Sequence, residues 1–107
     1  MSGEPEAPSR PAESARMTPR FELGRIVATP GALVSLSEAG QTPAQFLGRH
    51  INGDWGDVDD EDRQANEQSL LDDSRILSAY RLSTGERLWI ITEADRSSTT
   101  LLLPSEY

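Results

Sequence analysis

One histidine and the carboxylates that follow it are the first candidates for chemistry in this sequence. His50 lies four residues after Phe46 and three after Leu47, on the apolar side of a predicted helix. Asp54 and Asp57 could orient its imidazole as a general base. A capping or core-edge histidine near a helix end gives the same pattern. No serine, threonine or lysine stands at a spacing that suggests activation by this histidine.

A second polar cluster, Glu93, Asp95 and Arg96, lies at a predicted turn between two strands. Two carboxylates and an arginine could serve phosphodiester cleavage in a small ribonuclease-like toxin, although these are also ordinary turn residues. From residue 21 onward the chain has fifteen acids and seven arginines, which is unfavourable for nucleic-acid binding. A small hydrolase or nuclease-type toxin that uses His50, Asp54 or the Glu93–Arg96 hairpin is therefore the alternative interpretation.

The charge of the chain is concentrated in one segment. The formal net charge is −8, and Asp54–Asp73 contains nine acids and a single base, Arg63, while the rest of the chain is neutral. Charge this concentrated makes a local negative field, which repels nucleic acid and attracts a basic partner or a cation.

The acidic segment resembles a calcium loop only in part. Asp57, Asp59 and Glu61 alternate like the first three ligands of such a loop. However, Asp62 stands where glycine is needed, and Gln68 stands where a bidentate glutamate is needed. We therefore expect no metal site and no cofactor.

A non-enzymatic binding module is the favoured interpretation, with a basic protein surface as its partner. Trp55 lies in a glycine- and aspartate-rich loop, where it either fills the core or serves as an interface anchor. The predicted partner-binding residues are Asp54, Trp55, Asp57, Asp59, Asp60, Glu61 and Asp62.

Three helices are needed to position these residues. The dipeptides Thr29-Pro30 and Thr42-Pro43 each offer a hydroxyl cap before a proline, so they predict helix starts, with ends at Gly40 and Gly53. A third helix is predicted over Asp59–Leu71. Because its apolar face is incomplete, we expect it to lie on the surface.

Four segments have strand character, namely Phe21–Ala28, Arg75–Leu82, Arg87–Glu93 and Thr99–Leu103. With turns over residues 83–86 and 94–97, Tyr80 lies opposite Trp89 and one face carries Leu77, Ala79, Leu88, Ile90, Leu101 and Leu103. The face with Trp89 is then either covered by the first strand or a helix, which we favour, or used for binding. The fold class is α+β: an N-terminal strand and three short helices packed on a three-stranded antiparallel meander.

Residues 1–20 contain four prolines and almost no apolar side chains, so they predict a disordered tail before a single α+β domain over residues 21–107. No apolar run approaches the roughly 20 residues of a membrane span. A signal-peptide pattern and cysteine are both absent from the sequence. We therefore expect a cytoplasmic protein.

Three segments carry a family resemblance: IVATPGAL at residues 26–33, HINGDWGD at 50–57, and WIITEADRSSTTLLLP at 89–104 together with Tyr107. They resemble a family of small uncharacterised proteins carried on bacterial plasmids and integrative elements. The resemblance implies a cytoplasmic accessory protein of a mobile element and transfers no activity. Such proteins are sometimes labelled as restriction–modification methylase subunits, but this chain has neither a glycine-rich cofactor loop after a strand nor an Asn-Pro-Pro-aromatic motif. In that setting the basic partner would be a nucleic-acid-binding or host-defence protein.

Overall fold

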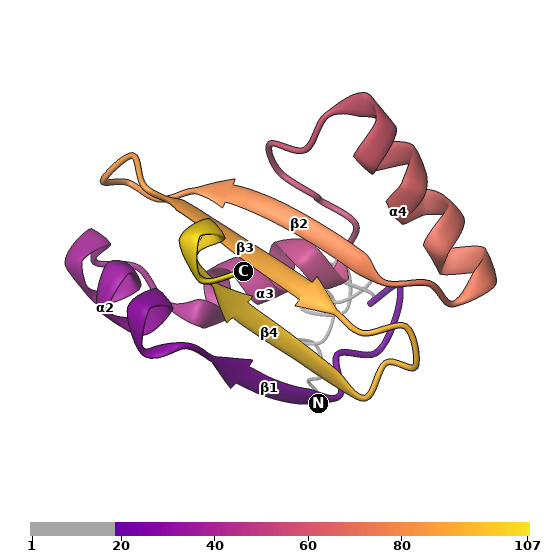
Figure 1. Cartoon of the computed structure of the whole chain (residues 1–107), viewed down its shortest axis with the longest axis horizontal. Helices are drawn as coiled ribbons and strands as arrows, with labels where there is room; N and C mark the ends of the chain where they lie inside the picture. The colour runs from indigo at the N-terminus through magenta and orange to yellow at the C-terminus, as the bar shows by residue number, and fades with distance from the viewer. Residues whose placement is uncertain (1–18) are drawn as a thin grey trace, which may run out of the picture.

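A four-stranded mixed sheet is the centre of the computed structural model, which describes residues 19–107 (Figure 1). The strand order is β1-β4-β3-β2, with β1 parallel to β4 and the other pairs antiparallel. Of the tail expected over residues 1–20, positions 1–18 lie outside the described residues. The elements are β1 (Arg25–Ala28), α2 (Pro30–Ala39), α3 (Pro43–Ile51), α4 (Asp60–Asp72), β2 (Ile76–Arg81), β3 (Arg87–Thr92), β4 (Ser98–Leu102) and the 3-10 turn η2 (Pro104–Glu106).

The predicted α+β class is confirmed, but the predicted sheet is incomplete. The antiparallel meander is present as β2, β3 and β4, whereas the N-terminal strand joins the same sheet as a fourth member instead of packing on it. This strand is also shorter than predicted. Gly24 has a φ of +66°, and its backbone lies against that of Arg96 and Ser97, so the extended conformation begins only at Arg25.

Local capping sets the helix starts as the sequence predicted, and Gly40 ends α2 as predicted, whereas α3 ends at Ile51 with Asn52, not Gly53, as its C-cap. The Thr29 hydroxyl accepts the Ala32 N–H at 3.1 Å, with Pro30 as the first residue of α2. Asp59 caps α4 in the same way, because its carboxylate accepts the Asp62 N–H at 2.7 Å.

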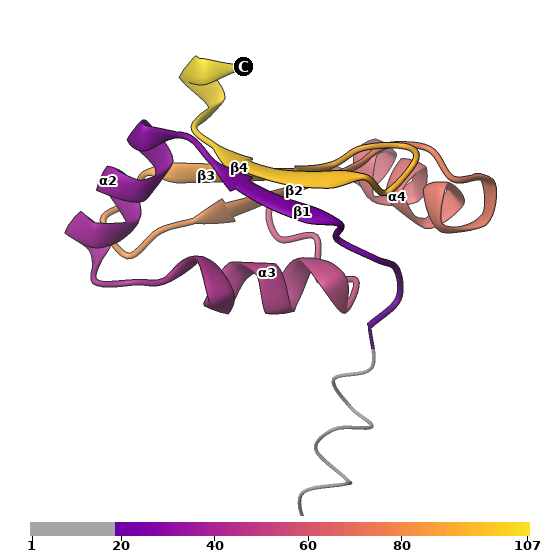
Figure 2. The same cartoon turned by 90° about the horizontal axis from the view of Figure 1, so that it is seen from below.

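Helices α2 and α3 cover one face of the sheet (Figure 2). The buried cluster between the helices and the sheet contains Ala32, Leu36, Phe46, Tyr80, Leu82, Leu88, Ile90 and Leu101. On the opposite face Ile91 and Leu102 are buried. The Tyr107 ring packs edge-on against the half-buried Trp89, with 5.6 Å between the two ring centroids. The C-terminal segment therefore contributes to covering the face with Trp89.

Strand β2 is shifted by one residue from the predicted register. Tyr80 lies opposite Leu88, and Trp89 lies opposite Ala79. The Leu82 N–H donates to the Glu86 carbonyl at 2.7 Å, so the turn is three residues long instead of four. Its last residue, Gly85, has the positive φ (+94°) that such a turn requires.

This one-residue shift exchanges the two faces of β2, because side chains alternate along a strand. Ile76, Ser78 and Tyr80 face the core with β3 residues Leu88 and Ile90. The prediction that Leu77 and Ala79 share this core face is wrong.

Helix α4 lies along the outer edge of β2 (Figure 1), where polar groups hold it. The Asn66 amide donates to the Leu77 carbonyl at 2.6 Å and accepts the Leu77 N–H at 3.1 Å. In the loop before α4, the Trp55 carbonyl accepts the Ala79 N–H at 3.0 Å and the Asp57 N–H donates to the Ala79 carbonyl at 2.6 Å. The outward backbone groups of these two β2 residues are therefore all hydrogen-bonded.

We predict that Asn66→Ala lowers the free energy of unfolding by about 2 kcal/mol, because it leaves the partly buried N–H and C=O of Leu77 without partners. Urea denaturation followed by tryptophan fluorescence measures the change. Gln64→Ala, an exposed position on the same helix, is the matched control and should change stability little. Equal effects of the two substitutions would show that the Asn66 pairing does not hold the helix.

Candidate functional site

His50 is fully buried at the end of α3. Its Nδ1 lies 2.6 Å from the Ser78 hydroxyl and its Nε2 lies 2.9 Å from the Thr92 hydroxyl. Thr92 in turn lies 2.7 Å from the Thr99 hydroxyl, which donates to the Leu23 carbonyl at 2.7 Å. We call these five groups the His50 chain.

The backbone carbonyl at the end of the His50 chain fixes the direction of the hydrogen bonds that lead from it back to His50 Nε2. Because a carbonyl only accepts, Thr99 donates to Leu23 and must accept from Thr92. The Thr92 hydroxyl then has no hydrogen left, so it accepts from Nε2–H of His50. His50 therefore carries a hydrogen on Nε2, and when the ring is neutral its Nδ1 accepts from Ser78.

The surroundings of His50 keep it uncharged. Burial, with a smaller contribution from the positive charge of Arg96, lowers the pKa of His50 from 6.5 to about 3. Both ring nitrogens are occupied by interior hydroxyl groups, and the ring has no exposed surface. This geometry gives His50 no route to a substrate as a general base.

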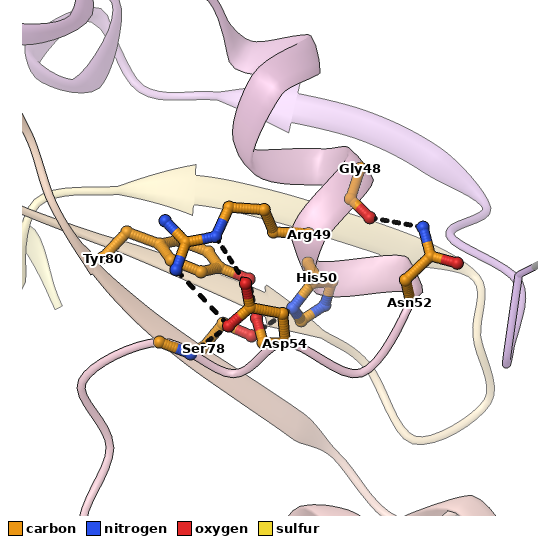
Figure 3. A network of polar contacts seen from close by, with 8 residues as sticks. Gly48, Arg49, His50, Asn52, Asp54, Ser78 and Tyr80 are labelled. Atoms are coloured by element: carbon orange, nitrogen blue, oxygen red, sulfur yellow. Dashed lines mark hydrogen bonds and ion pairs between the residues drawn. The ribbon is translucent and has the colours of Figure 1, made fainter. Parts of the chain in front are cut away.

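Asp54 belongs to a different group of contacts (Figure 3). Its carboxylate accepts from Arg49 Nε at 2.7 Å and Nη2 at 3.3 Å, and this pairing is the largest cause of its lowered pKa. The Arg49 guanidinium also lies over the Tyr80 ring at 4.5 Å, and the Tyr80 hydroxyl donates to the Asp54 carbonyl at 2.5 Å. Asp54 thus fastens its loop to α3 and β2, and the structure does not bring it to the His50 imidazole.

The Glu93–Arg96 hairpin is also bound up in local contacts. Arg96 donates to the backbone carbonyls of Ser69, Ser74, Glu93 and Ala94 at 2.6–3.2 Å. The Asp95 carboxylate accepts the N–H of Ser97 within the turn at 3.0 Å. Arg96 therefore ties the turn to the C-terminal end of α4, and its guanidinium is not aimed at an open site.

Trp55 fills the interior and does not offer an exposed anchor. Its side chain is buried, stacks on the Phe21 ring at 6.1 Å, and donates its Nε1–H to Glu67 at 3.0 Å. The same carboxylate pairs with Arg20 at 3.0 Å, and the Trp55 bond is the largest cause of its lowered pKa. Trp55 accordingly lies beneath the predicted partner-binding surface.

The remaining acids of the predicted surface point to solvent. Asp57 lies 3.9 Å from Arg81, and Asp59 caps α4. Asp60, Glu61 and Asp62 are exposed in the first turn of α4. Of the nine acids in Asp54–Asp73, three lie in ion pairs, and the other six form none with any residue between 19 and 107.

An exposed leucine lies on the same helix. Leu71 is 81% exposed and follows the spacing of Asp60, Gln64 and Gln68, so the four form one stripe along the outside of α4. This stripe borders a hollow of about 450 Å³, lined by Arg20, Arg63, Gln64, Glu67, Gln68, Leu70 and Leu71. The incomplete apolar face of the predicted helix was the available signal that one of its leucines lies outside the core.

No family model, curated protein or solved structure matches this chain. Within residues 19–107, no three histidine or acidic side chains lie together in a way that could hold a metal ion. In the same part of the chain, no helix is both long and apolar enough to cross a membrane. The candidate site is therefore defined by its own geometry: the outer surface of α4 and its first turn.

We predict that His50 makes the fold sensitive to mild acid. Because its folded pKa lies below its unfolded value, the stability it contributes is complete above pH 6.5 and falls toward pH 3. Each pH unit in this window costs about 1.4 kcal/mol. Glutamine at position 50 cannot titrate. Between neutral pH and about pH 4.5, the free energy of unfolding of the His50→Gln variant should therefore fall by about 2–3 kcal/mol less than that of the unmodified chain.

Urea titrations of both chains at several pH values measure this difference and cancel the contribution of the acids. Parallel pH profiles for the two chains would show that the imidazole is not held neutral.

Proposed function

We propose that this protein is a non-enzymatic binding module that docks a basic protein surface on the outside of α4. The surface consists of Asp60, Glu61 and Asp62 at one end of the helix and Leu71 at the other. Asp54, Trp55 and Asp57 support it from the preceding loop. In the mobile-element setting that the resemblance implies, a nucleic-acid-binding or host-defence protein is the proposed partner.

The way α4 is attached carries this proposal. The helix buries only Asn66 and Ser69, and its ties to the fold are hydrogen bonds and one ion pair instead of a packed apolar face. A helix of this kind adds little to the core. It does keep its acids together and exposed, which is the arrangement that accelerates association with a basic partner.

The charges at the start of α4 are also well placed energetically. Acids in the first turn are favoured by the helix dipole, which offsets part of their mutual repulsion. They can therefore remain unpaired in the free protein and pair with arginine or lysine in a complex. The exposed leucine at the other end of α4 supplies apolar contact that charge alone does not give.

The first test neutralises the acids without removing the helix. We predict that Asp60→Asn, Glu61→Gln and Asp62→Asn together weaken binding of a labelled arginine-rich peptide by about tenfold or more, since each exposed pair is worth up to about 1 kcal/mol. Fluorescence anisotropy at increasing salt measures the affinity. The stability of the variant should stay within about 1 kcal/mol, because the loss of dipole interaction and the relief of repulsion oppose each other.

A control with the same net charge separates docking from general attraction. Glu22→Gln, Glu38→Gln and Glu86→Gln neutralise three exposed acids elsewhere and produce the same change in formal charge. This control should keep its affinity within about twofold at moderate salt, where distant charges are screened. Equal losses in both triple variants would contradict a defined docking surface on α4.

The second test concerns Leu71. Because its side chain is mostly exposed, Leu71→Ser should leave the free energy of unfolding within about 0.5 kcal/mol of the unmodified chain. It should lower affinity for an arginine-rich peptide that also carries leucines, and leave affinity for one without apolar residues unchanged. An unaltered affinity for the leucine-containing peptide would remove Leu71 from the docking surface.

A further inference from the structure

The two edges of the sheet differ in how their backbone groups are used. At β2, Asn66 and the loop before α4 take up the outward N–H and C=O groups of Leu77 and Ala79. At β1, the Arg25 N–H donates to the carbonyl of Ser97, just before β4, at 2.9 Å, and the Thr29 N–H donates to that of Leu101 in β4 at 3.0 Å. Because backbone groups alternate along a strand, those of Ile26 and Ala28 point away from the sheet.

This β1 edge has the features of a pairing edge. Within residues 19–107, no hydrogen bond engages the outward groups of Ile26 and Ala28. Ile26 and Val27 are 45% and 43% exposed although both are β-branched and suited to a sheet. Natural sheets protect such edges with charge, proline or a covering element. The edge of β2 is protected by a covering element, namely α4 and the loop before it.

The β1 edge is complementary to itself in one register. If two β1 strands pair antiparallel about a two-fold axis at Val27, Ile26 of each copy exchanges two hydrogen bonds with Ala28 of the other. Arg25 then lies opposite Thr29, so no like charges meet. Registers centred on Ile26 or Ala28 would place Gly24, which is not extended, or Pro30, which lacks an N–H, at a bonding position.

The charge distribution does not oppose a second copy as the occupant. A chain of net charge −8 repels itself wherever its acids meet. The strand order puts β1 three strands away from β2, and α4 lies beyond β2. Three inter-strand spacings are about 14 Å, which exceeds the Debye length of about 8 Å at physiological salt.

We infer that this protein forms a two-fold homodimer by antiparallel pairing of its β1 strands, which joins the two sheets into one of eight strands. The two acidic α4 helices then lie at opposite ends of the dimer. The short edge makes this a weak association, with a dissociation constant in the micromolar range or above. This inference does not depend on the proposed function of α4.

A single cysteine tests the register, because the chain has no native cysteine. At a non-hydrogen-bonded antiparallel pair the Cα atoms are about 4.5 Å apart, within the range a disulfide spans. Under mild oxidation Val27→Cys should form a disulfide-linked dimer about a hundredfold faster than Val34→Cys, because pairing gives its thiols a millimolar effective concentration.

Val34 is a strict control for this experiment. Its side chain is 55% exposed, more than that of Val27, so random collision would favour cross-linking at position 34. In the proposed dimer the two α2 helices follow opposite ends of the paired β1 strands, with their starts about 14 Å apart, so strand pairing does not hold the two Val34 side chains together. If Val27→Cys cross-links no faster than Val34→Cys, the inference is wrong.

A charge exchange provides an independent readout by sedimentation equilibrium. The unmodified chain should approach twice its mass of 11.7 kDa as its concentration rises. Val27→Lys alone and Val27→Glu alone should stay monomeric, because each places like charges opposite each other, while their mixture should dimerise again. Circular dichroism checks that both variants fold. A monomeric unmodified chain at millimolar concentration, or a mixture that stays monomeric, would overturn the dimer and leave the edge free for an extended peptide of another protein.

Discussion

The His50 chain is the constraint on which the rest of the structure depends. It crosses the interior from β2 through α3 to β3 and β4 and ends on the segment before β1. Each member has one arrangement of donors and acceptors that satisfies its neighbours. An unpaired polar group in the interior is costly. The His50 chain therefore fixes the register of the strands and the position of α3 more specifically than apolar packing alone does.

The acidic segment combines two roles that its sequence does not separate. Asp54, Asp57 and Glu67 are tied to arginines and help to place the loop and α4. The acids of the first turn form no ion pair with residues 19–107, and they give α4 its negative field. The supporting acids hold the helix against the edge of β2, and in doing so they determine where the free acids face.

The sequence predicted those parts of the fold that depend on local chemistry. The Thr-Pro dipeptides gave the starts of α2 and α3, and Asp59 gave the cap of α4, because a cap is decided within a few residues. The register of β2 depends on whether the turn holds three residues or four, and the composition of the turn is compatible with both.

The placement of candidate side chains was harder to predict than the helix ends. Whether His50 faces water or the core depends on Ser78 and Thr92, which are distant in sequence. The position of β1 likewise depends on its long-range pairing with β4. Such contacts leave no periodic pattern in the chain.

The docking of α4 through Asn66 has a further consequence for aggregation: if the helix detaches, β2 becomes a second open edge, which can pair with β1 of another molecule. A head-to-tail contact that does not close into a ring extends into filaments, so α4 also protects the sheet against polymerisation.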